Sequence, residues 1–133
     1  AVLKDKYIYV FGGINDDGEL SSTERYSIDS NKWEVLPDIT KGPRSCHCAV
    51  TTPGSEILIV GDFEGTRIVD VFDTGPSLSW KNPTYLRHMP EERRCAAAVL
   101  MKKKYLVVIS GFDEDIVTAS GCLIYDIWCN RWS

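Results

Sequence analysis

The stretch YIYVFGG at residues 7–13 decides the fold class, because it recurs twice at a fixed distance. EILIVGD occupies residues 56–62 and YLVVISG occupies residues 105–111, so equivalent positions lie 49 residues apart each time. Each copy is a short apolar run, rich in β-branched and aromatic side chains, that leads straight into a glycine-containing turn. Such a run is typical of a strand buried on both faces. The fixed period indicates a repeat protein built from one small unit.

A second recurring spacing follows each glycine turn and its polar loop. A segment reading STERYSID, TRIVDVFD or GCLIYDI contains an aromatic residue, and a tryptophan comes seven or eight residues later. The aromatic residues are Tyr26, Phe72 and Tyr125, and the tryptophans are Trp33, Trp80 and Trp132. Links rich in Pro and Arg then lead into small-residue segments, RSCHCAV at 44–50 and RRCAAAV at 93–99. Each unit therefore supplies four short strands, and helical periodicity is absent.

This pattern resembles the kelch repeat over essentially the whole chain. The marks are the paired glycines after an apolar strand (FGG at 11–13), the downstream Tyr, the Trp about seven residues later, and the Arg before the next strand. A period near 50 with four strands per unit is the kelch form of the β-propeller blade. The departures are Asp62, Ser110 and Phe72, which indicate degenerate second and third repeats.

The resemblance implies an all-β fold, a kelch-type β-propeller segment made of four-stranded antiparallel blades. The units cover residues 1–37, 44–81 and 93–133. Propellers usually close with four to eight blades, and three blades leave two open edges. We therefore expect an incomplete propeller, whose remaining blades come from the rest of the chain or from another subunit.

The composition is that of an ordinary globular domain. The 133 residues are 44% hydrophobic and 26% charged, with a formal net charge of −4. An acidic balance argues against nucleic acid or an anionic membrane as the main partner, because both need a basic surface. Five cysteines without framework spacing favour free thiols in a reducing, intracellular and cytoplasmic setting.

The Cys-His-Cys run at 46–48 raises the question of a metal or redox site. As part of an innermost strand over 45–51, Cys46 and Cys48 would share one face and His47 would point the other way. Cys95 matches Cys46, and His47 is matched by Ala96, so small-residue packing explains the pattern. We expect these cysteines to be buried, free thiols, with zinc or redox roles as the alternative. No metal and no cofactor is expected.

The loops after the glycine turns carry acidic clusters, over 14–20, 62–66 and 112–118. Because strands alternate in direction within a blade, these loops and the links into the next blade must emerge on one face. The resemblance implies that Arg44 and Arg93, with Arg94 beside them, receive an acidic peptide; the alternative is a salt bridge to Glu91, Glu92 or a loop carboxylate. Apolar contact is expected from Phe11 or Phe112. The predicted partner-binding residues are Arg44, Arg93, Arg94, Asn15, Asp62, Glu64, Phe112 and Asp113.

No catalytic signature is present among the residues. The chain lacks a Gly-x-Ser-x-Gly run, a phosphate loop and a His-Glu-x-x-His run, and it has only two histidines. The resemblance implies a non-catalytic protein–protein interaction module, the propeller of an adaptor or scaffold component. The alternative is part of a carbohydrate-directed propeller enzyme or a lectin-like domain.

Overall fold

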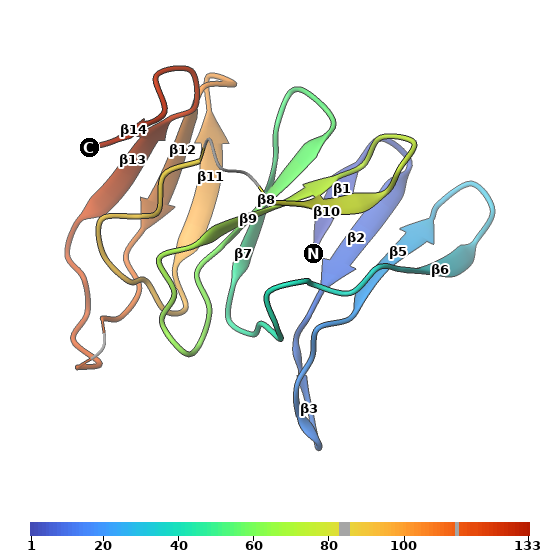
Figure 1. Ribbon diagram of the computed structural model, residues 1–133, viewed down its shortest axis with the longest axis horizontal. Coiled ribbons are helices and arrows are strands. Elements are labelled where there is room, and N and C mark those ends of the chain that lie inside the picture. Colours follow the sequence, from blue (N-terminus) through green and yellow to red (C-terminus); the bar gives the residue numbers. More distant parts are fainter. Residues whose placement is uncertain (83–85, 114) are drawn as a thin grey trace.

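The computed structural model describes residues 1–82, 86–113 and 115–133, and the regular structure of these residues is entirely β (Figure 1). Three four-stranded antiparallel sheets follow one another along the chain, with one short hairpin besides. The described residues include no helix long and apolar enough to cross a membrane. The predicted all-β architecture of four-stranded antiparallel blades is confirmed.

Each sheet, called a blade from here on, is an antiparallel meander of four strands. The first blade has the order β1 (Val2–Lys4), β2 (Tyr7–Phe11), β5 (Thr23–Ser27), β6 (Lys32–Leu36). The second blade is β7 (Cys48–Thr51), β8 (Glu56–Val60), β9 (Val69–Asp73), β10 (Ser79–Lys81). The third blade is β11 (Ala97–Met101), β12 (Tyr105–Ile109), β13 (Cys122–Asp126), β14 (Arg131–Trp132). The sequence analysis missed the hairpin of β3 (Ile14–Asn15) and β4 (Gly18–Glu19) that extends from the first blade.

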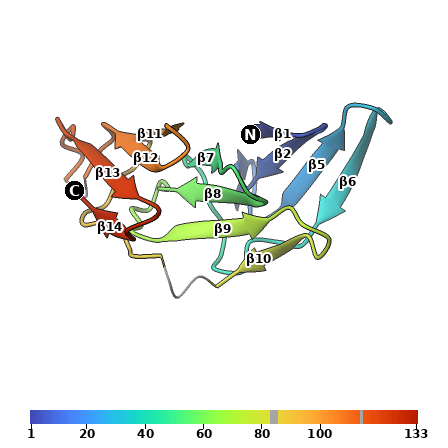
Figure 2. The same ribbon diagram turned by 90° about the horizontal axis from the view of Figure 1, so that it is seen from above.

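The blades fan out from one row of inner strands. Figure 2 shows β1, β7 and β11 along one edge of the molecule and β6, β10 and β14 toward the other. The strand β7 contacts both β1 and β11. This is the arrangement of successive propeller blades around a channel.

The residue after the second strand of each blade takes a left-handed backbone conformation. The φ angles are 52° at Gly12, 73° at Gly61 and 56° at Ser110. At Gly12 an added Cβ would lie 2.2 Å from the carbonyl oxygen of Arg44, so the backbones meet there without room for a side chain. The 49-residue period therefore records a backbone requirement at the end of each second strand.

The Tyr-to-Trp spacing of seven residues is explained by the turn between the outer two strands. The hydroxyl of Tyr125 donates to Oδ1 of Asn130 at 2.6 Å, and the hydroxyl of Tyr26 bonds Oδ1 of Asn31 in the same way. Asn31 and Asn130 have positive φ angles of 54° and 50°, which Asn tolerates better than most residues. Phe72 of the second blade has no hydroxyl, and its turn is one residue longer.

The core lies between the blades. One cluster packs Tyr9 and Phe11 of the first blade against Ile57, Ile59 and Phe72 of the second. The other packs one face of the second blade, through Val50, Leu58, Val60, Val69 and Val71, against Met89, Leu106, Val108, Leu123 and Tyr125. Phe11 is 3% exposed, so the expectation that it offers apolar contact to a partner is wrong.

Tryptophans join the second and third blades to the link that precedes each of them. The indole Nε1 of Trp80 donates to the carbonyl oxygen of Pro37 at 2.8 Å. The indole of Trp132 donates to the carbonyl oxygen of Arg87 at 2.9 Å. The repeated Trp thus ties an outer strand to the polypeptide arriving from the blade before it.

The small-residue segments begin with a turn, which corrects the expected placement of the cysteines. Strand β7 starts at Cys48, and Cys46 and Cys95 have φ angles of 53° and 52°. Both are exposed, so the prediction that they are buried in an inner strand is wrong. Only Cys48 lies in the strand; it is half-buried, and its thiol donates to the carbonyl oxygen of Ala96 at 2.6 Å. All five cysteines are free.

Candidate functional site

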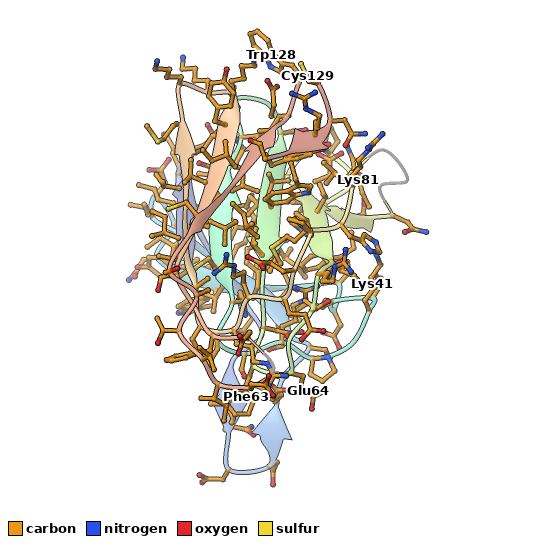
Figure 3. The ribbon with its side chains drawn as sticks, turned by 90° about the vertical axis from the view of Figure 1, so that its left-hand side faces the viewer. Lys41, Phe63, Glu64, Lys81, Trp128 and Cys129 are labelled. Atoms are coloured by element: carbon orange, nitrogen blue, oxygen red, sulfur yellow. The ribbon has the colours of Figure 1, made fainter. Side chains whose placement is uncertain are left out.

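The loops after the second strands gather at one end of the blades, here called the loop face. In Figure 1 the β3–β4 hairpin projects from this end, and in Figure 3 Phe63 and Glu64 lie beside it while Trp128 and Cys129 lie at the opposite end. The links between blades meet these loops there. The amide of Gly13 donates to the carbonyl of Arg44 at 2.8 Å, and Phe112 and Arg94 exchange backbone hydrogen bonds of 2.9 Å. The structure therefore brings the loops and the arginine-bearing links together.

Arg44 and Arg93 point into the molecule instead of outward. The Arg44 side chain is 4% exposed, and its Nη2 lies 2.6 Å from Oδ2 of Asp70, itself 3% exposed. Its Nη1 donates to the carbonyl oxygen of Gly61 at 2.9 Å. The expectation that Arg44 presents its guanidinium to a partner is therefore not met, because a buried carboxylate already occupies that group.

Arg93 repeats this arrangement in the third blade. It is 2% exposed, and its Nη1 donates to the carbonyl oxygen of Ser110 at 3.3 Å, as Arg44 does to the equivalent Gly61. Its Nη2 pairs with Glu91, one of the carboxylates expected as the alternative to a partner. Each of these arginines thus donates a hydrogen bond to the carbonyl oxygen of the residue 17 positions later, which has a left-handed backbone conformation. This contact supports the fold.

Arg94 is the predicted arginine that remains within reach of a partner. Its side chain is 26% exposed and lies 3.9 Å from Glu92. A Cβ on Gly65 would come within 2.7 Å of its Nε, so Arg94 lies against the loop over 62–66. Beside it, a depression of about 270 Å³ is lined by Arg67, Pro90, Glu91, Glu92 and Asp113. The mixed-charge surface expected on this face is present there.

The predicted polar loop residues shape their own loops. Oδ1 of Asn15 accepts from the amide of Asp17 at 2.9 Å, and Oδ1 of Asp62 accepts from the amide of Thr66 at 2.9 Å. Oδ1 of Asp113 accepts from the amides of residues 115 and 117. Glu64 is exposed at its loop tip. The predicted loop over 112–118 includes residue 114, which lies outside the described residues. A role in partner binding for these residues stays a prediction.

Apolar side chains at the loop tips are the feature that sequence reasoning missed. Five of them are exposed on the loop face, by the fractions Ile14 71%, Phe63 59%, Phe112 37%, Ile116 73% and Val117 59%. Only Phe112 among them was predicted. The available signal was a large apolar residue inside an acidic loop, as in DFEG at 62–65. Exposed apolar side chains grouped on one surface are typical of interaction sites.

The loop face is strongly acidic. The loops over 14–20, 62–66 and 112–118 hold three, two and three Asp or Glu residues and no Lys or Arg. Within the described ranges, none of the carboxylates in these loops forms an ion pair with a Lys or Arg. Their charge is therefore available to a binding partner.

Comparison with known proteins supports the repeat. Residues 1–40 match the family described as Kelch motif. The first blade therefore lies within a kelch motif. Kelch-like protein 41b of Danio rerio is 26% identical over 105 residues, which is 79% of this chain and 16% of that protein. Kelch-like protein 41a of Danio rerio is 50% identical over 34 residues, 26% of this chain and 6% of that protein. The chain therefore spans only a small part of the length of these relatives.

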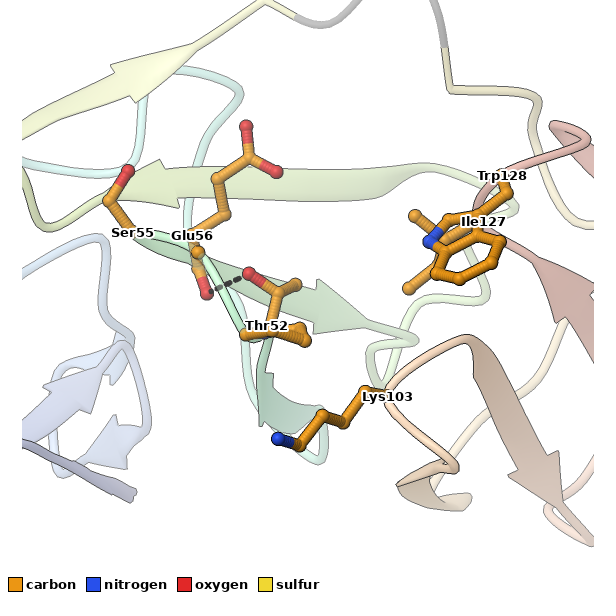
Figure 4. Close-up of a pocket in the computed structure, with 8 residues that line it drawn as sticks. Thr52, Ser55, Glu56, Lys103, Ile127 and Trp128 are labelled. Atoms are coloured by element: carbon orange, nitrogen blue, oxygen red, sulfur yellow. Dashed lines mark hydrogen bonds between the residues drawn. The ribbon is translucent and has the colours of Figure 1, made fainter.

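The opposite end of the kelch blades carries a second hollow, of about 520 Å³ (Figure 4). It is formed by the turn over 52–56 of the second blade together with Lys103, Ile127 and Trp128 of the third. The hydroxyl of Thr52 donates to the carbonyl oxygen of Glu56 at 3.1 Å and holds that turn closed. Trp128 is 77% exposed at the rim. This surface, the turn face, is the competing candidate for partner binding.

The titratable side chains beside the inner strands are shifted toward their uncharged forms. In the part of the chain that the structure describes, no three His, Cys, Asp or Glu side chains group as metal ligands. Burial, with Arg44 nearby, lowers the pKa of His47. Burial raises the pKa of the Cys48 thiol. Both shifts favour the uncharged forms, as expected for side chains packed beside the inner strands.

Proposed function

We propose that this chain is a protein–protein interaction module that works as part of an adaptor or scaffold, without catalysis of its own, in the cytoplasm. The observation that carries the proposal is the loop face: exposed apolar tips, including Phe63 and Ile116, stand among unpaired carboxylates at the ends of packed strands. Binding residues concentrate on loops that a rigid scaffold positions. Apolar anchors supply most of the binding energy at such surfaces, and charges around them give specificity.

The chemistry of the partner follows from which charges are free. The sequence predicts an acidic peptide as partner of Arg44 and Arg93, but both guanidinium groups are buried and already paired with carboxylates. The loops offer carboxylates instead, and Arg94 is the predicted cation that is still partly exposed. We therefore favour a segment that combines basic and apolar side chains, and an acidic peptide docking on Arg94 is the competing outcome.

The partner class can be tested with two synthetic peptides of equal length, one alternating Lys and Leu and one alternating Glu and Leu. Fluorescence anisotropy should show binding of the Lys peptide that weakens as salt is raised, because screening reduces attraction between exposed charges. Preferential binding of the Glu peptide would show that the partner is acidic, and equal binding of both would contradict a charge-selective face.

The face can be tested by capturing partners from a cell extract with three forms of the chain. The loop variant Phe63→Ser/Ile116→Ser should lose proteins that the wild-type chain retains. The control variant Trp128→Ser changes an apolar side chain that is also exposed, at the opposite end, and should keep them. Loss with the control and retention with the loop variant would move the binding site to the turn face.

The carbohydrate-directed alternative has its own readout. Trp128 is exposed beside the turn that contains Thr52 and Ser55. An aromatic ring beside hydroxyl groups is the feature that favours carbohydrate binding. Binding to a glycan array that disappears in Trp128→Ser would support this alternative over a protein partner.

A further inference from the structure

Two cysteines of neighbouring blades meet just before the inner strands begin. Cys46 precedes β7 of the second blade, and Cys95 stands at the equivalent place before β11 of the third. These two strands lie side by side (Figure 2). The thiol of Cys48 donates to the carbonyl oxygen of Ala96 at 2.6 Å, which brings the two segments into contact. The side chains of Cys46 and Cys95 are hydrogen-bonded to each other.

Both cysteines adopt a backbone conformation that is unfavourable for a residue with a side chain. Their φ angles are 53° and 52°, in the left-handed region that glycine enters freely. A residue with a Cβ is strained there, and such strain is typical of functional sites. Because glycine would fit both turns with less strain, packing alone does not explain a thiol at each position.

The surrounding contacts hold both thiols in place and leave them accessible. Two residues before each cysteine, a buried arginine donates to the carbonyl oxygen of the left-handed residue that follows a second strand; these arginines are Arg44 and Arg93. Cys46 and Cys95 are themselves exposed. Two thiols that are fixed side by side and open to solvent are suited to disulfide formation, because neither has to be brought to the other.

We propose that Cys46 and Cys95 form a reversible oxidation site, at which a low-molecular-weight disulfide such as glutathione disulfide converts the two thiols into one disulfide between the second and third blades. In a reducing compartment such a bond is transient and responds to the redox state. The redox alternative for the Cys-His-Cys run is thus assigned to Cys46 with its counterpart in the next blade, and not to Cys46 with Cys48.

The oxidation takes two exchange steps. The Cys46 thiolate attacks one sulfur of glutathione disulfide, a new S–S bond forms as the old one breaks, and one glutathione thiolate leaves. The Cys95 sulfur then attacks the Cys46 sulfur of this mixed disulfide, and the second glutathione thiolate leaves. The two cysteine protons end on the two glutathione molecules, so the protein thiols lose two electrons and glutathione disulfide gains them. Cys46 attacks first because the hydrogen bond keeps the proton on Cys95, whose pKa is raised.

Peptide mapping identifies the bond. The chain is equilibrated in buffers with an increasing share of glutathione disulfide, free thiols are blocked with N-ethylmaleimide, and trypsin is added without reductant. Cleavage after Arg and Lys places Cys46 in the peptide 45–67 and Cys95 in the peptide 95–102. Mass spectrometry should find these two peptides joined, and excess reduced glutathione should separate them. Glutathione adducts without the joined peptides, or two unmodified thiols, would overturn the proposal.

Three variants show which thiol takes part, because the peptide 45–67 contains both Cys46 and Cys48. The joined peptides should persist in Cys48→Ala and disappear in Cys46→Gly and in Cys95→Gly. Glycine suits the left-handed backbone of both turns, so the reduced glycine variants should melt close to the reduced wild type. Joined peptides that survive in Cys46→Gly would show that Cys48 is the partner and would contradict the assignment.

The melting temperature reports whether the bond forms in the native packing. A disulfide between Cys46 and Cys95 closes a loop of about 50 residues, and it stabilises the fold by constraining the unfolded chain. The oxidised wild type should therefore melt roughly 10 °C above its reduced form, whereas Cys95→Gly should melt at one temperature in both buffers. An oxidised wild type that melts no higher than the reduced one would contradict a bond between natively packed blades.

Cys129 provides the internal control in the same digests. It is exposed in the turn between β13 and β14. It should take up glutathione in the oxidising buffers without joining the peptide that contains Cys46. If Cys129 joined that peptide as often as Cys95 does, the bond would reflect random exchange between exposed thiols, and the proposal would fail.

Discussion

Arg44 and Asp70 form a buried ion pair, with 2.6 Å between Nη2 and Oδ2 and both side chains less than a twentieth exposed. Lys41 adds a second positive charge 3.6 Å from the same carboxylate. The pair joins the link after the first blade to β9 of the second. Residues that looked like surface recognition groups in the sequence thus hold two blades together.

Removing one member of this pair should destabilise the fold. Arg44→Met removes the buried partner of the Asp70 carboxylate and leaves it only the more exposed Lys41 at 3.6 Å, so we expect a loss of about 3–5 kcal/mol in the free energy of unfolding. Urea denaturation followed by tryptophan fluorescence measures it. The exposed pair of Lys6 and Asp29 is the control, and Lys6→Met should cost less than about 1 kcal/mol.

The double variant Arg44→Met/Asp70→Leu separates an unpaired charge from lost packing. Replacing both charges by apolar groups should recover much of the loss, although the carbonyl of Gly61 still loses its donor. A single variant as stable as the wild type would show that the pair contributes little.

Two matched substitutions test the backbone requirement at the end of the second strand. Gly12→Ala places a Cβ against the carbonyl of Arg44 at a positive φ, and should cost about 1–3 kcal/mol. Ser110→Gly relieves a left-handed serine at the equivalent position of the third blade and should stabilise by up to about 1 kcal/mol. In thermal melts, the melting temperature should fall for Gly12→Ala and rise for Ser110→Gly. A change in the same direction for both variants would contradict the backbone explanation.

His47 should make stability depend on pH. Burial and the charge of Arg44 lower the pKa of this imidazole in the folded chain, so the unfolded chain binds a proton first as the pH falls. Its contribution is present above about pH 6.5, the ordinary pKa of histidine, and is lost progressively below that value. Melting temperatures measured between neutral and mildly acidic pH should fall less steeply in His47→Gln.

Cys46, Cys48 and Cys95, at the start of the small-residue segments, should differ in reactivity. Cys48 is half-buried, its thiol donates to Ala96, and burial raises its pKa, so the reactive thiolate is scarce. Cys95 is exposed, but a hydrogen bond with Cys46 raises its pKa. Alkylation with iodoacetamide followed by mass spectrometry should therefore modify Cys46 first and Cys48 last. Fast modification of Cys48, or stoichiometric zinc in the purified chain, would contradict its assignment as a packing residue.

Local pattern was enough to predict the blades. The runs YIYVF, EILIV and YLVVI become β2, β8 and β12 because apolar β-branched residues followed by a left-handed turn leave the backbone few alternatives. The spacing from Tyr26 to Trp33 also reflects a local constraint, the hydroxyl-to-Asn31 bond within one turn. Constraints that act over a few residues leave their mark in residue type and spacing, so the sequence shows them.

The Arg44 side chain points inward because of residues that are distant from it in the sequence. Its partners, Asp70 and the carbonyl of Gly61, lie on another blade and become available only when the blades pack. Cys46 likewise lies outside the strand, in a turn with a φ of 53° before β7 begins at Cys48. The exposure of Phe63 and Ile124 likewise depends on which surfaces face a neighbouring blade. Sequence alone determined the repeat and its strands because those follow from nearest-neighbour backbone preferences. The tertiary structure decided which charges are free and which apolar faces are open, because burial is a property of the packed blades and not of any one segment.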